Sequence, residues 1–411
     1  MTSSSESLKQ LFQEEFAKMV AVISRLYGLQ FIETAEDIVS DTFLTASEHW
    51  GTRGMPANPR AWLYTVAKQK TLYHFRRQQL FDQKIRPAIS HEQPKSEEQE
   101  PDFSPQHIRD SQLQMLFAIC NPAIAAEAQI GLALRILCGF GIDEISEAFL
   151  TNKETINKRL FRAKEKLREE NISLEFPPEA ELPGRLDRVL HIIYLLFNEG
   201  YYSKTQNRVL QQELCVEALK LGLLLTEYEK TNLPETQALI ALMCFHASRF
   251  EARLSSDDGL ILYEDQDESK WDRQLIHQGI HYLKLSASGD QLSNWHIEAR
   301  IASWHSIRED SPEKWEQILQ LYDQLLALKF SPGAALNRIY ALYKVKGSGE
   351  ALESAMALNI PQNHFYWLLL GELQADKDPL QAAMSFKKAL SLARTTPEKE
   401  GISRKISLQK K

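Results

Sequence analysis

Apolar side chains recur three and four positions apart along almost the whole of this 411-residue chain. Runs in which β-branched residues alternate with polar ones are missing from it. A spacing of three and four matches the 3.6-residue turn of an α-helix, whereas a half-buried strand needs a period of two. The sequence therefore predicts an all-α fold, and its length predicts two to four domains rather than one core.

One segment interrupts the helical pattern. Between residues 87 and 107 the chain holds four prolines, five acidic residues and few apolar ones, so this stretch cannot build a core. We expect a flexible acidic linker over residues 85–107. It would separate a first helical domain, residues 1–84, from a second helical domain, residues 108–171.

A second proline-rich stretch, ENISLEFPPEAELPG, closes the second domain. We expect a separate helical body over residues 186–411. Near its end, Gly371, Ala382 and Phe386 have the small-and-aromatic spacing by which two antiparallel helices of a tetratricopeptide unit interlock. The body is therefore predicted to contain TPR-like repeats, with an irregular helical bundle as the alternative.

Composition narrows the class of protein. The chain is 43% hydrophobic and 25% charged, which is typical of soluble globular proteins, and no apolar run in it is long enough to cross a membrane. Its N-terminal stretch lacks the pattern of a signal peptide, so we expect a cytoplasmic protein. The four cysteines are widely spaced and neither CxxC nor HExxH occurs, which predicts buried thiols, no metal site and no cofactor.

A basic stretch, EISEAFLTNKETINKRLFRAKEKL, stands out in a chain whose net charge is −7. It has the form of a helix-turn-helix, which needs a short helix, a tight turn and a second helix with one buried stripe. Thr151 or Asn152 can cap the second helix. The expected buried stripe consists of apolar residues at helical spacing, namely Ile156, Leu160, Ala163 and Leu167.

The rest of that second helix is left for contact with DNA. We predict that its first residues, from Lys153 to Lys158, enter the major groove and that Arg159, Arg162, Lys164 and Lys166 meet phosphates or flank the groove. The predicted DNA-binding residues are Lys153, Glu154, Thr155, Asn157, Lys158, Arg159 and Arg162. The alternative is a solvated helix whose cations only keep it soluble.

A second basic segment lies between Arg53 and Arg86. It holds eight basic residues and a single acid, Asp82, with aromatic residues interleaved. Aromatic rings stack on unpaired bases while cations hold the phosphates, so this composition predicts binding to a melted strand. The alternative is a packed helix with solvated cations.

The helix before that segment, AEDIVSDTFLTASEHW, is expected to bury one face and to present an acidic one. Its acidic residues are Glu36, Asp37, Asp41 and Glu48. An acidic face repels DNA, whereas it suits a basic protein surface. We therefore expect a protein partner here.

These three segments together resemble the sigma-70 type initiation factors of bacterial RNA polymerase, in the compact extracytoplasmic-function (ECF) group. AEDIVSDTFLTASEHW is similar to the segment that docks on the polymerase clamp, with Asp37, Asp41 and Phe43 at its characteristic positions. NPRAWLYTVAKQKTLYHFRR is similar to the segment that melts and reads the minus-ten element. The helix-turn-helix is similar to the reader of the minus-thirty-five element.

The resemblance implies a set of residues at the minus-ten element: Arg53, Asn58, Arg60, Trp62, Lys68, Gln69, Tyr73, Arg76 and Arg77. Four positions depart from the family pattern. Lys68 and Gln69 replace a common Arg-Asn pair, Tyr73 stands where an aspartate is usual, and Leu150 replaces the common glycine of the turn.

The remaining chain resembles the long extension of one ECF subgroup, which carries a tetratricopeptide-like domain. The resemblance implies that this domain regulates the factor, that core RNA polymerase and promoter DNA are partners, and that a small YCII-like protein is a further partner. Such a factor makes and breaks no bond, so it is not an enzyme.

Two rival interpretations stay open. A one-component transcription regulator would also join a helix-turn-helix to a TPR-like sensor, but it has no use for the aromatic basic segment. An enzyme is the other rival, and no nucleophile, base and orienting group can be assembled from neighbouring positions. The acidic run at residues 264–268 lacks the spacing of a calcium loop.

Overall fold

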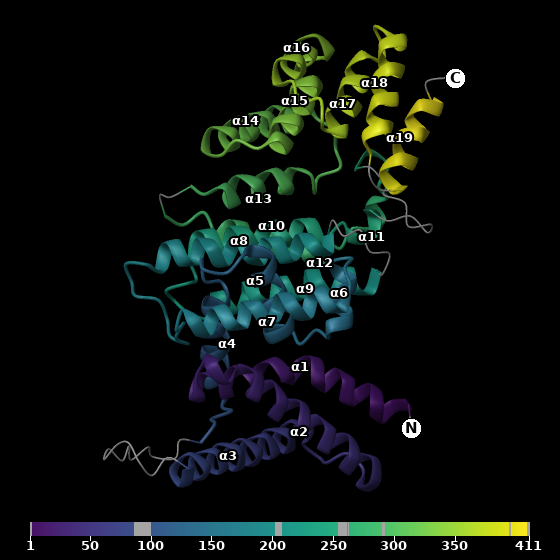
Figure 1. Ribbon diagram of the computed structural model, residues 1–411. Coiled ribbons are helices and arrows are strands. Elements are labelled where there is room, and N and C mark those ends of the chain that lie inside the picture. The colour runs from purple at the N-terminus through teal and green to yellow at the C-terminus, as the bar shows by residue number, and fades with distance from the viewer. Residues whose placement is uncertain are drawn as a thin grey trace. The chain divides into compact units, whose positions relative to one another are not determined.

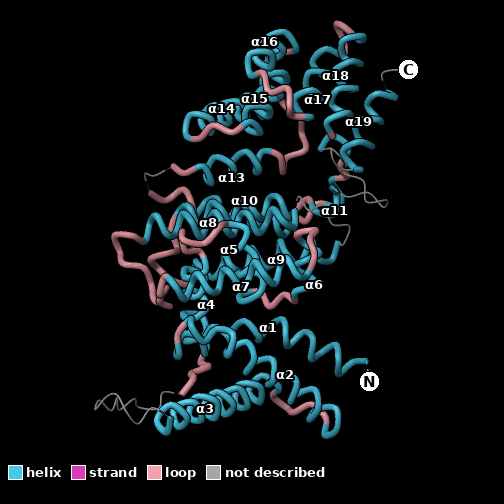
Figure 2. The backbone as a smooth tube through the Cα atoms, in the orientation of Figure 1, coloured by secondary structure: helices cyan, strands magenta, loops and turns pink. Residues whose placement is uncertain are grey.

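The computed structural model describes residues 2–85, 100–201, 208–253, 261, 263–289, 292–393 and 396–408. These residues form helices joined by loops, with no strand among them (Figures 1 and 2). The predicted all-α fold is therefore confirmed. Most of the predicted linker, residues 86–99, lies outside the described part of the chain.

One compact unit comprises residues 1–200 and 209–217. Its elements are α1 (Thr2–Tyr27), η1 (Leu29–Phe31), α2 (Ile32–Arg53), α3 (Pro59–Ile85), α4 (Pro105–Ile119), α5 (Ala126–Leu132), the π-helical turn η2 (Ala133–Leu137), α6 (Ile142–Ala148), α7 (Lys153–Glu169), α8 (Leu182–Tyr201) and part of α9 (Arg208–Thr226).

The core of this unit is built around α1, which packs against α2, α3, α4 and η2. Phe16, Met19, Val20 and Ile23 of α1 are fully buried. Because α4 belongs to the second predicted domain, α1 joins the first and second predicted domains into one unit. The linker sequence predicted two separate modules, and the apolar face of α1 is the reason that they pack together here.

The first unit also extends past the predicted boundary at residue 186. Arg185, in α8, donates a hydrogen bond to the carbonyl oxygen of Phe117 at 2.6 Å. Arg188 Nε donates one to Gln129 Oε1 at 3.1 Å. These bonds tie α8 to α4 and α5, so α8 lies with the helix-turn-helix rather than with the C-terminal body.

The second compact unit comprises residues 201–208 and 218–411. Its elements are the rest of α9, α10 (Pro234–Ala247), α11 (Phe250–Arg253), η3 (Tyr263–Asp265), η4 (Glu268–Lys270), α12 (Arg273–Leu285), α13 (Asn294–Trp304), α14 (Pro312–Leu328), α15 (Pro332–Lys346), α16 (Ser348–Leu358), α17 (His364–Gln374), α18 (Pro379–Leu392) and α19 (Thr396–Leu408).

Several helices of this unit begin with a cap residue followed by proline. Ser311, Ser331 and Asp378 each accept a hydrogen bond from the backbone N–H three residues further on. Proline occupies the next position in each case, where its missing N–H costs nothing and its fixed φ suits a helix. These short signals set where α14, α15 and α18 start.

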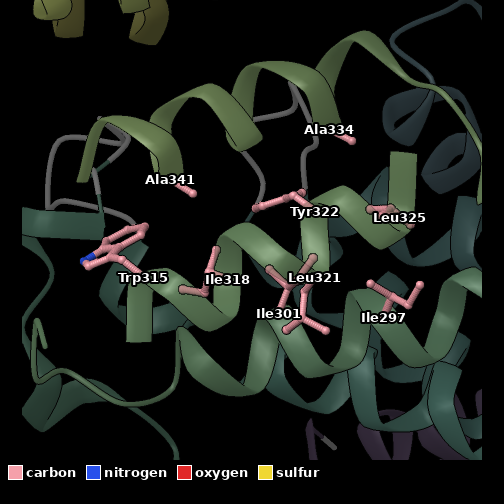
Figure 3. Packing of buried hydrophobic residues seen from close by; sticks show 9 residues of the cluster. All are labelled: Ile297, Ile301, Trp315, Ile318, Leu321, Tyr322, Leu325, Ala334 and Ala341. Carbon is pink, nitrogen blue, oxygen red and sulfur yellow. The ribbon is translucent and has the colours of Figure 1, made fainter. Parts of the chain in front are cut away.

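Successive helices share cores. Figure 3 shows side chains of α14, including Trp315, Ile318 and Leu321, between Ile297 and Ile301 of α13 and the alanines of α15. Ala334 and Ala341 are small, which lets α15 approach α14 closely. Each helix therefore packs between its neighbours in the chain.

The pair α17 and α18 interlocks as its sequence predicts. A Cβ added to Gly371 would lie 2.6 Å from the ring of Phe386, so only glycine fits there. Ala382 and Ala389 are fully buried on the same face of α18. The helix pairing agrees with the small-and-aromatic signature, while the assignment to a TPR-like repeat stays a prediction. Among the helices of the described residues, none is both long and apolar enough to cross a bilayer.

Candidate polymerase and nucleic-acid interface

The acidic surface of α2 consists of Asp37, Asp41, Leu44 and Glu48, all exposed. Their spacing of four, three and four places them on one face of the helix. Leu44 is 58% exposed amid three carboxylates. Sequence reasoning missed this leucine, because an apolar residue at helical spacing is normally assigned to the core. An apolar centre with an acidic rim is typical of a surface that binds a basic protein partner.

Phe43 is not part of the exposed surface: it lies on the buried side of the helix, as its spacing with Ile38, Val39, Thr42 and Ala46 predicts, while the docking role that the resemblance implies for it stays a prediction. Its side chain is buried, and its ring meets the ring of Phe12 edge-on at a centroid distance of 5.0 Å. Phe43 therefore holds α2 against α1. A role for it in docking would be indirect, through the position of the helix.

Glu36 also leaves the predicted acidic face. It is 6% exposed, and its carboxylate forms ion pairs with Arg135 Nε at 3.0 Å and with Lys164 Nζ. Lys164, expected near DNA phosphates, is itself only 9% exposed. A buried charge needs a paired opposite charge, and the carboxylate of Glu36 is paired with two cations.

A second ion pair, between Glu33 of α2 and Arg168 of α7, lies at the edge of the same contact. We refer to Glu33, Glu36, Arg135, Lys164 and Arg168 as the α2–α7 ion cluster. It connects helices that are more than 100 residues apart in the chain. The acidic helix expected to bind a partner is thus in contact with the helix expected to bind DNA.

A cleft of about 380 Å³ lies beside the ion cluster. Its lining includes Asp37 and Ser40 of α2, and Asn157 and Phe161 of α7. Phe161 is exposed although it is aromatic. The contact between α2 and α7 is therefore incompletely filled and includes both polar and apolar side chains, unlike the apolar contacts of α1.

The outward face of α3 carries part of the predicted minus-ten set. Trp62, Gln69, Tyr73 and Arg76 are seven, four and three positions apart, so they share one side of the helix. Tyr73 is 69% exposed, and Gln69, Arg76 and the adjacent Arg77 are exposed as well. Trp62 is half-buried and meets the ring of Trp50 at 5.3 Å, so it also helps to fix α3 on α2.

The first turn of α3 is held in place by other members of the predicted set. Asn58 Oδ1 accepts a hydrogen bond from the backbone N–H of Ala61 at 3.1 Å, which caps the helix. Arg60 pairs with Glu14 and Glu15 of α1. Both residues are therefore engaged in structure here. Arg53 is exposed at the end of α2.

The described end of the acidic linker lies against α3. Lys68 forms an ion pair with Glu100, and the ring of Tyr64 stacks on the ring of Phe103 at 4.9 Å. Burial, together with a hydrogen bond to Glu15, raises the pKa of Tyr64, so its phenol stays protonated at neutral pH. One predicted DNA-binding cation, Lys68, is thus occupied by a carboxylate of the same chain.

The helix-turn-helix is formed by α6 and α7. Asn152 is the N-cap of α7, and its side chain accepts a hydrogen bond from the backbone N–H of Thr155 at 2.8 Å. Leu150 occupies the turn with φ of +46°, a left-handed conformation that favours glycine. The predicted apolar stripe is buried, as expected: Ile156, Leu160, Ala163 and Leu167.

The outward residues of α7 form ion pairs within the helix-turn-helix and its neighbour α5. Lys153 pairs with Asp143 at 2.7 Å, and Lys158 pairs with Glu154 at 2.6 Å. Arg159 pairs with Glu127 of α5 at 3.1 Å. Exposed pairs of this kind contribute about 1 kcal/mol or less, so a DNA phosphate can replace the carboxylate.

Three further members of the predicted set are exposed on α7, namely Thr155, Asn157 and Arg162. Arg162 forms no ion pair with any described residue. It is therefore the cation of this helix most directly available to a phosphate.

The cysteine thiols are shielded from solvent. All four cysteines are buried, and burial raises the pKa of the Cys120 and Cys244 thiols to about 12. Burial also lowers the pKa of His305 to about 3, so its imidazole is neutral. In the described part of the chain no cluster of three or more His, Cys, Asp and Glu residues could hold a metal ion.

Comparison with known proteins agrees with the geometry of α1 to α3. Residues 11–81 match sigma-70 region 2, and residues 185–287 match DUF6596, a family of unknown function. An uncharacterized protein of Rhizobium meliloti (strain 1021) is 32% identical over 378 residues, which cover 89% of this chain and 88% of that protein. No solved structure matches the chain.

The chain belongs to the same family as the Rhizobium protein. Its region 2 supports a sigma-70 family sigma factor, a class that interacts with core RNA polymerase and promoter DNA. Region 2, residues 11–81, contains the acidic surface of α2 and the exposed face of α3 up to Arg77.

Proposed function

We propose that this protein is an ECF-type sigma factor that docks on core RNA polymerase, recognises a two-part promoter and opens it. The observation that carries the proposal is the position of two surfaces within region 2. An exposed acidic helix face and an exposed aromatic and basic helix face lie on consecutive helices, α2 and α3. A sigma factor needs both, one for the enzyme and one for the melted strand.

The acidic surface of α2 is the proposed polymerase-docking site. Asp37 and Asp41 supply charge that steers a basic partner surface into register, and Leu44 supplies apolar area at the centre. Asp41 already pairs with Lys70 of α3. That pair is exposed, so exchange for a polymerase cation would cost little.

The outward face of α3 is the proposed site for the melted minus-ten element. Tyr73 offers a ring that is 69% exposed, on which an extruded base can stack. Unstacking a base costs a few kcal/mol, while stacking on an aromatic side chain returns about 1–3 kcal/mol per base. Arg77 and Arg76, one turn further, are placed for the phosphates of the same strand.

The helix-turn-helix is the proposed reader of the minus-thirty-five element. Its apolar stripe is buried while Thr155, Lys158 and Arg162 face outward, as insertion into a major groove requires. Asn157 is exposed but lines the cleft beside α2. A one-component regulator could use the same motif. A one-component regulator does not explain why residues 11–81 match sigma-70 region 2, so we favour the sigma factor.

The second unit is proposed to regulate the factor, and a small YCII-like protein is retained as a proposed partner. The described helices from α13 to α19 pack in series, an arrangement with a long surface for protein contacts. On this proposal the protein works in the cytoplasm, where the polymerase is, and carries out no reaction of its own.

Affinity for purified core RNA polymerase tests the docking proposal. We expect the full-length chain to bind core, and the double variant Asp37→Lys with Asp41→Lys to lose most of that affinity because it places like charges against a basic surface. The matched control makes the same charge change at two exposed positions in the second unit, Glu309→Lys with Glu313→Lys.

Circular dichroism should show that both double variants fold, since the four positions are exposed. Equal binding by the two variants would refute α2 as the docking site. Failure of the unaltered chain to bind core at all would refute the proposed function.

A further inference from the structure

Three cations of the second unit surround one tyrosine ring. The Cζ atoms of Arg249 and Arg308 lie 5.5 Å and 5.7 Å from the centroid of the Tyr263 ring. Lys314 Nζ lies 5.2 Å from the same centroid. Arg249 follows α10, Arg308 precedes α14, and Lys314 belongs to the first turn of α14. We refer to Arg249, Arg308 and Lys314 as the Tyr263 cation cluster.

Two cations of this cluster are buried without a carboxylate. Arg249 is 8% exposed, its Nε has no hydrogen-bond partner, and it forms no ion pair with a described residue. Lys314 is 1% exposed and donates to two neutral oxygens, the hydroxyl of Tyr263 at 3.0 Å and the carbonyl of Ile307 at 2.5 Å. A buried ion needs an opposite charge, and neither oxygen supplies a full one.

The acids beside the cluster are paired with other residues. Asp310 is exposed, and its carboxylate pairs with Lys344 at 3.0 Å and accepts a hydrogen bond from Trp315 Nε1. Glu268 pairs with Arg273. The buried cations of the cluster therefore have no counter-charge of their own among the described residues.

The tyrosine cannot supply that charge either. Burial raises the pKa of Tyr263, so its phenol is neutral at pH 7. A cation–π contact recovers only part of the cost of burying a charge. Burial lowers the pKa of Lys314, and Arg308 and Arg249 lower it further against the effect of Asp310. The cluster is thus an electropositive position that an anion would stabilise.

Two more buried nitrogen atoms near the ring have no hydrogen-bond partner. Trp271 is 3% exposed, its ring centroid lies 6.2 Å from that of Tyr263, and its Nε1 has no acceptor. The ring of His305 lies 5.2 Å from the same tyrosine, and its Nδ1 is likewise unpartnered. A neutral imidazole can donate from one nitrogen. Buried donors are normally satisfied, so these two favour a ligand with several acceptor oxygens.

We propose that the Tyr263 cation cluster binds a phosphate group, either as the free ion or as part of a small phosphoester. Such a group carries about two negative charges and three or more strong acceptor oxygens, and guanidinium and ammonium groups bind it well. Arg308 and Lys344 are partly exposed, which lets the ligand approach from solvent. The proposal goes beyond the sigma-factor function and does not depend on it.

A bound phosphate would join two parts of the second unit. Arg249 and Trp271 lie within residues 185–287, which match DUF6596, whereas Lys314 belongs to the helices that follow. A ligand that contacts both parts stabilises the folded unit, because it binds the folded chain and not the unfolded one.

Calorimetric titration of the full-length chain tests the site. The probes are inorganic phosphate and glycerol phosphate, with acetate at the same ionic strength as the singly charged control. We expect saturable binding of one phosphate group per chain, and binding of acetate that is at least about 10-fold weaker. Tighter binding of inorganic phosphate identifies the free ion as the ligand, and tighter binding of glycerol phosphate identifies a phosphoester. Failure of both to bind overturns the proposal.

Arg249→Met tests where the phosphate binds. The change removes a buried charge that has no partner, so the melting temperature without phosphate should stay the same or rise. Phosphate affinity should fall by at least about 10-fold, because a charged hydrogen-bond donor is lost. The control, Arg273→Met, removes an exposed cation that pairs with Glu268 and should change neither property.

A lower melting temperature of Arg249→Met without phosphate would show that Arg249 serves the fold, and it would overturn the proposal. Unchanged phosphate affinity would overturn it as well. Lys314→Met is the second variant and should weaken phosphate binding by a similar factor. All of these measurements are made without polymerase, so failure of the phosphate site leaves the sigma-factor proposal standing. Failure of the chain to bind core polymerase likewise leaves the phosphate site standing.

Discussion

Helices α3 and α7 have similar compositions and different surroundings. Both carry a cluster of cations in an acidic chain, and both are predicted to contact DNA. In α3 the ring of Tyr73 and the side chains of Gln69 and Arg77 point outward. In α7 the cations divide between an outward set and an inner pair, Lys164 and Arg168, held by α2.

The comparison shows that a cluster of cations in the sequence can predict a binding surface. It does not show whether those cations are exposed or already paired within the chain. The outward face of α3 is exposed in this structure. The ion pairs that α3 forms with other parts of the unit involve Arg60 and Lys68. Helix α7 is paired with α2 through Lys164, whose ion pair with Glu36 is buried, and removing one partner of a buried pair is costly. We therefore expect substitutions at Lys164 and Arg168 of α7 to affect the fold, and those on the outward face of α3 to affect DNA melting.

The largest expected effect comes from Glu36→Ala. This change leaves Arg135 and Lys164 without their buried carboxylate, so the free energy of unfolding of the first unit should fall by about 3–5 kcal/mol. Urea titration followed by circular dichroism measures it. Glu48→Ala on the exposed side of the same helix should stay within about 0.5 kcal/mol. Equal losses would mean that the ion cluster does not hold α7.

A smaller effect is expected from Tyr73→Ala on α3. Loss of the stacking ring should weaken promoter opening by about 1–3 kcal/mol, seen as reduced fluorescence of a base analogue in the minus-ten element. Binding to core polymerase should not change. His74→Ala, an exposed neighbour on another side of α3, is the control. Normal opening by the tyrosine variant would remove α3 from the proposed melting site.

Arg162→Ala tests the outward side of α7. Loss of one phosphate contact should weaken binding of the holoenzyme to promoter DNA and lower the slope of log affinity against log salt by about 0.9. The same titration with Lys166→Met, whose side chain pairs with Glu170, should leave the slope unchanged. If the slope is unaffected by Arg162→Ala, the assumed orientation of α7 on DNA is wrong.

The smallest effect concerns the turn before α7. Leu150 has φ of +46°, and a side chain in that conformation costs about 1 kcal/mol relative to glycine. Leu150→Gly should therefore raise the free energy of unfolding by up to about 1 kcal/mol. Asn171→Gly, at φ of +48°, should gain less because asparagine tolerates this region. Thermal unfolding of the two variants provides the comparison, and a destabilised Leu150→Gly would contradict it.

Much of the fold follows from local patterns in the sequence. The apolar stripe from Ile156 to Leu167, the cap at Asn152 and the tight approach at Gly371 were all predictable, because each depends on residues within one or two turns. The departure from glycine at Leu150 was also visible, although its left-handed conformation needed coordinates.

The long-range contacts that decide which side chains of the candidate interface are buried were not predictable from one sequence. Lys164 stands four residues after Leu160 and three before Leu167, so its position in the buried stripe could be inferred. Its partner Glu36 lies 128 residues away, and nothing local pairs the two. The helical spacing of Phe43 predicted its burial, but its contact with the ring of Phe12 could not be predicted from the sequence. Leu44 was not predicted as a surface residue, because an apolar residue at helical spacing is normally assigned to the core, yet it is exposed.

The central claim is that this chain, joined to core RNA polymerase, opens a promoter through α3. Permanganate reactivity of thymines measures opening directly on promoters selected by the holoenzyme from a pool of DNA fragments. The account predicts reactive thymines in the minus-ten element with the unaltered chain and with His74→Ala, and greatly reduced reactivity with Tyr73→Ala. Core polymerase carrying the unaltered chain and melting no fragment in the pool would contradict it.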